Sequence, residues 1–165
     1  MKDLVLDLRG NPGGYLSMAV NICDEFLSPG NLIVYTEGRN RPRENYFSTK
    51  RGALENIGII VLIDEGSASA SEIIAGAVQD NDRGVIIGRR SFGKGTVQEQ
   101  IPLKNGDAVR LTTSRYYTPS GRCIQKDYGK NPKEYFTKTS KIEQSDDSLI
   151  FTTKKGRLVY GRGGI

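Results

Sequence analysis

The chain has 165 residues, 36% of them apolar and 26% charged, with no histidine and a formal net charge of +5. This composition is that of one globular domain and excludes a disordered chain, and no apolar run approaches the ~20 residues of a membrane-spanning helix. Much of the positive charge lies in two polar stretches, residues 39–51 and 126–141, without the interleaved aromatic residues of a nucleic-acid surface, so no nucleic-acid partner is expected. Cys23 and Cys123 are too few and too far apart to predict a disulfide framework or a zinc site.

The first half of the chain alternates predicted strands and helices. An apolar run at residues 4–8 ends at a glycine-rich turn, and helical spacing of apolar residues follows from 16 to 27. A strand is predicted at 32–35, and then, after a polar, arginine-rich loop, a second one at 58–63, whose unbroken apolar run is typical of a strand buried on both faces of a parallel sheet.

A helix at residues 69–80 and a strand at 84–88 complete a second strand–helix–strand unit. This order predicts an α/β fold with a layered βαβ core and right-handed crossovers. Alternating segments at 97–103 and 108–116 then predict a β-hairpin, and residues 149–160 predict a final hairpin that turns at 154–156.

The stretch from 120 to 148 is polar and lacks periodicity. We therefore expect a core of residues 1–125, a polar loop region of residues 126–148, and a segment of residues 149–165 that begins a C-terminal extension. The chain enters a strand almost at its first residue and stops directly after another, so we expect a piece of a longer protein.

Three serines, Ser67, Ser69 and Ser71, cluster where a buried strand is predicted to enter a helix. The spacing of Ser69 and Glu72 fits a capping box, so one interpretation is that this serine only caps the helix. The other interpretation is a nucleophile, favoured by the small alanines beside it and by the unpaired amides of a helix end, which would face an oxyanion. Spacing alone leaves both open.

Without histidine, a catalytic serine needs another base, and Lys94 between Gly93 and Gly95 is the candidate. A lysine acts as a base only as the neutral amine, which desolvation favours, and flanking glycines let the backbone pack closely around it. The alternative is a surface lysine in a flexible turn.

Residues 88–94 (GRRSFGK) also match the start of a phosphate-binding P-loop. In this chain, however, Gly95 replaces the magnesium-binding hydroxyl and a strand pattern follows instead of a helix, so no nucleotide is expected.

Taken together, three segments resemble the carboxy-terminal processing peptidases, also called tail-specific proteases. They are LVLDLRGNPGG at residues 4–14, GSASASEI at 66–73 and GKGTVQ at 93–98, and Ser69 and Lys94 lie 94 minus 69, or 25, residues apart as in the family. The resemblance extends from residue 4 to about residue 125. It implies a fold like that of the ClpP/crotonase-like proteins, with β-hairpin additions toward the C-terminus.

The resemblance also implies roles for individual residues. Ser69 would be the nucleophile, in preference to its neighbouring serines, and Lys94 the general base. Gln98 would orient the lysine, on the same side of a strand if that strand starts early, and Glu72 would support the site by capping the helix. The oxyanion hole would use the backbone amide of Ala70 and one from the glycine turn, with Gly14 preferred over Gly13.

The implied reaction is serine endopeptidase chemistry by a serine–lysine dyad through an acyl-enzyme, with no metal or cofactor. The implied partners are unfolded or tail-marked polypeptides, bound extended near a strand edge. A PDZ domain would precede this segment in the parent protein, and the location would be extracytoplasmic, periplasmic or associated with the cell envelope. A catalytically inactive peptide-binding scaffold of the same fold is the alternative, and the oligomeric state is not predicted.

Overall fold

The structure is a computed structural model that describes residues 1–128, 135 and 149–165. Its elements in chain order are β1 (Asp3–Asp7), α1 (Leu16–Phe26), β2 (Leu32–Gly38), β3 (Arg41–Phe47), β4 (Gly58–Ile63), α2 (Ala70–Asp80), β5 (Val85–Gly88), β6 (Thr96–Pro102), β7 (Ala108–Tyr117), β8 (Ile150–Thr152) and β9 (Leu158–Tyr160). Among the described residues, no helix has the length and apolar character needed to cross a membrane.

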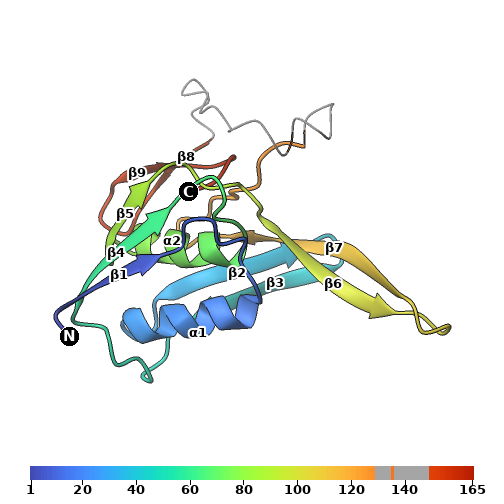
Figure 1. The fold of residues 1–165 in the computed structure, drawn as a ribbon, viewed down its shortest axis with the longest axis horizontal. Helices are drawn as coiled ribbons and strands as arrows, with labels where there is room; N and C mark the ends of the chain where they lie inside the picture. The colour runs from blue at the N-terminus through green and yellow to red at the C-terminus, as the bar shows by residue number, and fades with distance from the viewer. Residues whose placement is uncertain (129–134, 136–148) are drawn as a thin grey trace.

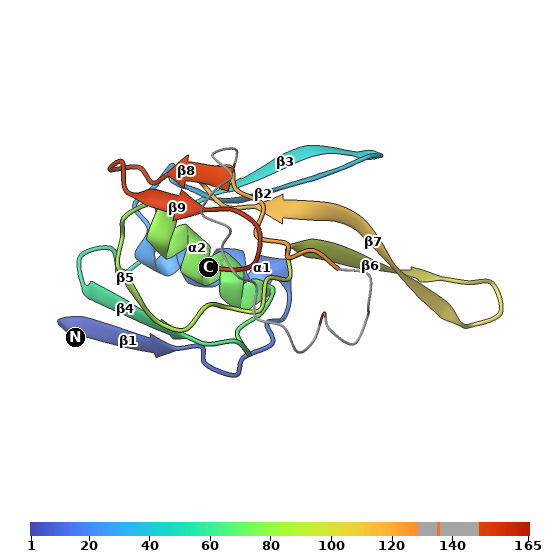
Figure 2. The same cartoon turned by 90° about the horizontal axis from the view of Figure 1, so that it is seen from above.

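Two sheets enclose the helices. A parallel sheet has the strand order β1-β4-β5, and an antiparallel sheet has the order β3-β2-β7-β6. Figure 2 shows β1 and β4 on one side of the helices and β2, β3 and β7 on the other, while Figure 1 shows the β6–β7 hairpin projecting far from the body. The predicted α/β class is therefore correct, with the helices as a central layer.

The central helix is α2, because all of its residues except Gln79 are buried. Small residues on this helix, Ala75, Gly76 and Ala77, allow close approach from several sides, and a Cβ on Gly76 would lie 2.8 Å from a methyl carbon of Thr118. Its N-terminal end is consequently held in place by packing along its whole length.

One of the two predicted βαβ units is confirmed and the other is wrong. β4, α2 and β5 form a parallel unit, with β4 paired directly to β5. β1 instead pairs with β4, and β2 pairs antiparallel with β3 and β7 in the other sheet. The physical reason is that β2 packs against both helices with a run of buried residues at 33–36, which places it across the helical layer from β1.

The prediction that residues 58–63 are buried on both faces is also wrong. Ile59, Val61 and Ile63 are buried toward the helices, whereas Ile60 and Leu62 on the other face are half-buried. Neighbouring strands continue that outer face, where Val5, Val85 and Ile87 are exposed. Only one face of this sheet contributes fully to the core.

The arginine-rich segment expected to be a loop is the strand β3. It pairs with β2 in an irregular register and lies at the edge of its sheet with almost every residue exposed. An edge strand with two solvated faces shows no apolar alternation, which is why the sequence pattern missed it. Its arginines contribute to surface contacts, as with Arg43 over the Tyr35 ring at 3.6 Å.

Both predicted hairpins are confirmed, as β6–β7 and β8–β9. Segment 149–165 also packs on the body, since Val159 is buried and Ile165 belongs to the main hydrophobic core. The predicted polar loop region, 126–148, falls mostly outside the described residues.

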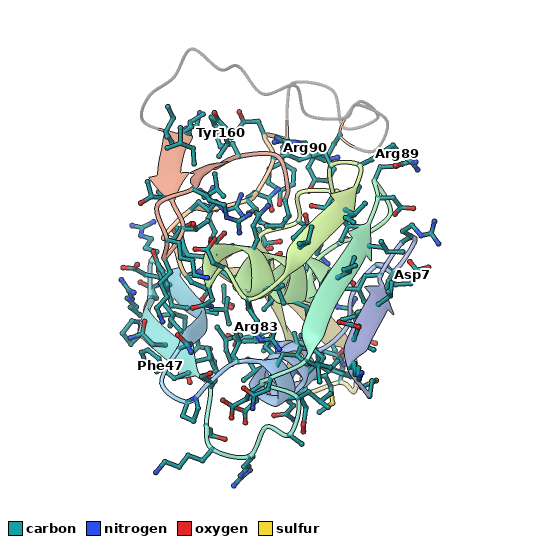
Figure 3. All side chains as sticks on the ribbon, turned by 90° about the vertical axis from the view of Figure 1, so that its left-hand side faces the viewer. Asp7, Phe47, Arg83, Arg89, Arg90 and Tyr160 are labelled. Atoms are coloured by element: carbon teal, nitrogen blue, oxygen red, sulfur yellow. The ribbon has the colours of Figure 1, made fainter. Side chains whose placement is uncertain are left out.

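Arg83, labelled in Figure 3 below the central helix, joins three parts of the chain. Its guanidinium donates to the carbonyls of Phe26, Leu54 and Ile57 at 2.7, 2.9 and 2.7 Å. Asp7 and Arg89, labelled in the same view, mark the carboxyl ends of β1 and β5. The loops that leave these strand ends carry the candidate site.

Candidate active site

Ser69 is the residue immediately before α2, and its backbone is strained. Its φ of 55° and ψ of −114° lie in a region that residues other than glycine rarely adopt. Such strain persists only where surrounding structure enforces it, and it concentrates at functional sites, including the strand-to-helix turns that carry nucleophiles. The helix begins one residue later than predicted, and Ser69 is its N-cap.

The structure distinguishes Ser69 from its two neighbouring serines. The Ser67 hydroxyl is fully buried, donates to the Leu8 carbonyl at 2.7 Å and accepts the Asp64 amide at 2.9 Å. The Ser71 hydroxyl is also buried and donates to the Asn11 carbonyl at 3.1 Å. Ser69 is half-buried, so among the three it is the hydroxyl that a substrate can reach.

The glycine turn after β1 lies directly against this helix end. A Cβ on Gly13, whose φ is +97°, would lie 2.5 Å from the Ala68 carbonyl oxygen and 2.7 Å from the Ala70 nitrogen. The Gly13 amide donates to Asn11 Oδ1 at 2.9 Å, whereas no hydrogen bond within the described part of the chain uses the Gly14 amide. The turn therefore brings one unengaged amide into the neighbourhood of the Ala70 amide.

Glu72 connects the serine segment to the lysine segment. Its Oε2 accepts the backbone amides of Ser69 at 2.8 Å and Lys94 at 2.9 Å. Its Oε1 accepts the Ser91 hydroxyl at 2.6 Å and the Gly93 amide at 2.7 Å. Burial raises the pKa of this carboxyl, and the four hydrogen bonds oppose that effect by favouring the charged form.

Tyr116 makes a second connection between the same two segments. This β7 residue is almost completely buried, and its hydroxyl donates to the Lys94 carbonyl at 2.6 Å and also reaches the Ser69 carbonyl at 3.2 Å. Burial raises the pKa of the Tyr116 phenol well above its ordinary value, so it stays a donor at physiological pH. The backbones of Ser69 and Lys94 are thus linked through two different side chains.

The side chain of Lys94 is half-buried and forms no hydrogen bond or ion pair with any residue in the ranges 1–128, 135 and 149–165. Lys94 lies outside β6, which begins at Thr96, so the condition for placing it and Gln98 on one side of the same strand is not met. Gln98 is exposed on β6, opposite Thr112. Roles for Lys94 and Gln98 in catalysis stay predictions.

Lys126 is a second amine beside the site, and the sequence reasoning did not single it out. It is buried, and its Nζ lies 3.8 Å from the ring centre of Phe92 and 4.7 Å from that of Tyr135. Burial lowers the pKa of this amine, while the charge of Glu72 opposes the shift. The aromatic faces therefore stabilise a partly desolvated cation, and the charge of the Glu72 carboxylate favours the same protonated form.

The sequence reasoning also missed Ser91 and Tyr116. Ser91 is buried and carries no local signal beyond its place before the glycine-framed lysine. Tyr116 had a usable signal, because the predicted strand 108–116 has a period of two that places Tyr116 on the same face as Ser114, and both residues are buried. The P-loop alternative is weakened further, since residues 96–102 are a strand as expected and not a helix.

Comparison with known proteins shows the family of this chain. The model of peptidase family S41 matches residues 1–135, and the chain belongs to this family. It is 56% identical over 126 residues to a carboxy-terminal-processing protease of Bartonella bacilliformis, and 40% identical over 126 residues to the carboxy-terminal processing protease CtpB of Bacillus subtilis. A solved photosystem II D1 C-terminal processing protease superposes with a TM-score of 0.67 at 37% identity, covering 73% of this chain and 31% of that one.

These matches cover the greater part of this chain but a minor part of each relative. The alignments take in 76% of this chain, 29% of the Bartonella protein and 26% of the Bacillus protein. Other relatives include chloroplastic C-terminal processing peptidases of Tetradesmus obliquus and Arabidopsis thaliana. The chain therefore spans less than a third of the length of these two bacterial relatives.

Proposed function

We propose that the chain carries the chemistry of a serine endopeptidase that hydrolyses peptide bonds in unfolded or tail-marked proteins. Ser69 Oγ attacks the peptide carbonyl while Lys94 Nζ takes its proton, and the lysine then protonates the leaving amine. Water hydrolyses the acyl-enzyme with the lysine again as base. The observation that carries the proposal is that Glu72 Oε2 accepts the amides of both Ser69 and Lys94.

The oxyanion in this proposal is stabilised by backbone amides. The Ala70 amide is at the N-terminal end of α2, where the positive end of the helix dipole favours negative charge. Gly14 is the second donor, supported by its unengaged amide and by the contact of Gly13 with the helix end. Gln98 is proposed as the side chain that orients the lysine amine.

The substrate is proposed to bind as an extended strand. β6 begins two residues after Lys94 and is an edge of the described antiparallel sheet, so its outer backbone groups can pair with a peptide. We also propose that residues 1–125 are the catalytic core, with a ClpP/crotonase-like arrangement, and that the parent protein works outside the cytoplasm with a PDZ domain.

Cleavage of an unfolded protein such as reduced casein tests the proposal. The wild-type chain should cleave it, and Ser69→Ala or Lys94→Ala should lower the rate by at least about 10³-fold, since dyad members act as a unit. Ser17→Ala and Lys50→Ala, which change exposed residues, are the matched controls and should cleave like wild type. Peptide binding without turnover by the wild-type chain would overturn the proposal in favour of an inactive scaffold, and an unchanged cleavage rate in Ser69→Ala would overturn it by showing that Ser69 is not the nucleophile.

A further inference from the structure

The segment that carries Lys94 is held unusually tightly for a glycine-framed turn. Every backbone N–H and C=O of residues 93–95 has a hydrogen-bond partner. Glu72 accepts two of the amides, and Tyr116 supplies its hydroxyl to the Lys94 carbonyl and its own amide to the Gly95 carbonyl at 3.0 Å. The interpretation of this segment as a flexible surface turn is therefore wrong.

The remaining partners come from Gln125 and Lys126. The Lys126 amide donates to the Gly93 carbonyl at 3.0 Å, and Gln125 Oε1 accepts the Gly95 amide at 2.8 Å. A Cβ on Gly95 would lie only 2.8 Å from the Gln125 nitrogen, so the two backbones are in direct contact. The bond to Gln125 is made by a side chain and can be removed without changing the backbone.

The Gln125 side chain is itself fixed. It is buried, with 6% of its surface exposed, and its Nε2 donates to the Lys126 carbonyl at 2.8 Å and to the Tyr135 hydroxyl at 3.1 Å. Both ends of the amide are thus engaged, so the acceptor oxygen has one orientation. Gln98, in contrast, is exposed on the hairpin beyond Lys94.

Glycines on both sides of Lys94 would otherwise give this backbone wide conformational freedom. Gly93 indeed has a φ of +85°, which other residues seldom adopt. A base must be held within about 0.5 Å of its working position, and a side chain can be no better placed than its own Cα. The position of the Lys94 Cα is therefore fixed by the hydrogen bonds that residues outside this segment make to its backbone.

We propose that Gln125 is a positioning residue for Lys94, which it holds through the Gly95 amide. This inference rests on the proposed serine–lysine function for its catalytic consequence, but its structural part stands on the hydrogen bonds alone. Loss of the Gln125 acceptor frees the Gly95 amide and lets residues 93–95 sample other conformations. Substrate binding is unaffected, and the rate of acylation falls.

Gln125→Leu tests this, because leucine has a similar size and no acceptor. Hydrogen exchange of the Gly95 amide, followed by NMR, should accelerate at least about tenfold relative to core amides such as that of Val61. Casein cleavage should show a kcat lowered about 10-fold to 100-fold with KM unchanged. Asn21→Leu, which likewise replaces an amide side chain by leucine but at an exposed position of α1, is the matched control and should change neither quantity.

Gln125→Glu provides a conservative rescue. Its protonated carboxyl keeps an acceptor for the Gly95 amide and one donor for the Lys126 carbonyl, where the amide has two donors, whereas the ionised form would face that carbonyl with a second acceptor. This variant should therefore protect the Gly95 amide at low pH and lose that protection as its carboxyl ionises. Wild-type protection of the Gly95 amide from exchange in folded Gln125→Leu would overturn the inference. So would protection of this amide in Gln125→Glu that is the same whether the carboxyl is protonated or ionised.

The two proposals fail separately. If the wild-type chain does not cleave casein, the proposed function fails, and the exchange of the Gly95 amide still decides whether Gln125 holds the segment. If the Gly95 amide responds but kcat does not, Gln125 is structural only and the positioning role is overturned.

Discussion

The Glu72 carboxylate accepts the backbone amide of Lys94 at 2.9 Å across 22 residues of chain. The same oxygen accepts the amide of Ser69, so one buried atom sets the distance between the two backbones. A capping box alone would require only the contact within the helix. The additional bonds to Gly93 and Lys94 turn a helix cap into a connection between segments.

Glu72→Gln should destabilise the fold by about 3 kcal/mol. All four neighbours of the carboxylate donate hydrogen bonds, and a glutamine amide has only one acceptor oxygen, so its nitrogen would face donors it cannot bind. Urea unfolding measures the loss. Glu37→Gln, at an exposed position of β2, should change stability by less than about 0.5 kcal/mol, and an equal effect of both variants would contradict the central role of Glu72.

Tyr116→Phe should lower the free energy of unfolding by about 1–2 kcal/mol, because the buried carbonyl of Lys94 loses its donor. The neighbouring Tyr117→Phe is the control. Tyr117 stacks on Tyr35 with ring centres 4.7 Å apart, and phenylalanine keeps that contact. Denaturant midpoints of the two variants give the comparison, and a cost confined to Tyr117→Phe would show that the Tyr116 hydroxyl is dispensable.

Local patterns predicted most elements of the fold because those elements are buried on one face or turn sharply. The apolar stripe of α2, the hairpin turn at 104–107 and the short strand β5 are each specified within a few neighbouring residues. β2 was assigned to the wrong sheet because strand pairing is decided by the packing of both helices, which the local pattern does not contain. The edge strand β3 gave no signal for the opposite reason, since neither of its faces is buried.

The candidate site was only partly predictable for a related reason. Ser69, Glu72 and Lys94 lie in compact motifs whose residue types indicate chemistry. Their mutual placement depends on hydrogen bonds across long stretches of sequence, such as those made by Tyr116 and Gln125. A buried tyrosine or glutamine in a strand or loop looks the same in sequence whether it fills the core or positions a neighbouring segment.

Gly13→Ala should destabilise the chain by about 2–4 kcal/mol, since its Cβ would overlap the Ala68 oxygen and the Ala70 nitrogen and its φ of +97° disfavours any side chain. Gly14→Ala is the adjacent control, because a Cβ there meets nothing within 4 Å, and it should stay within about 1 kcal/mol of wild type. Thermal unfolding distinguishes the two. Equal melting temperatures would mean that the glycine turn does not press on the helix end.

Acid should loosen the loop between β4 and α2 through Asp64. Its Oδ1 accepts the Gly10 amide at 2.8 Å and the Gly66 amide at 2.9 Å, and the bond from Gly10 is the main reason that the pKa of this carboxyl lies below its ordinary 3.8. A carboxyl with a lowered folded-state pKa contributes stability above its unfolded-state value and loses it as the pH falls. We therefore expect the urea concentration at the unfolding midpoint to be constant near neutral pH and to decrease when the pH falls below about 4.

Asp64→Asn isolates this contribution, because the amide oxygen can still accept from Gly10 and Gly66 but no longer titrates in this range. The variant should be somewhat less stable than wild type at neutral pH, since hydrogen bonds to a charged acceptor are stronger, and its midpoint should fall less steeply with acid. The pH dependence of the two midpoints can be compared directly. Parallel acid curves would assign the acid sensitivity to other carboxylates, whereas convergence at low pH would place it at the contact that joins the glycine turn to the strand preceding Ser69.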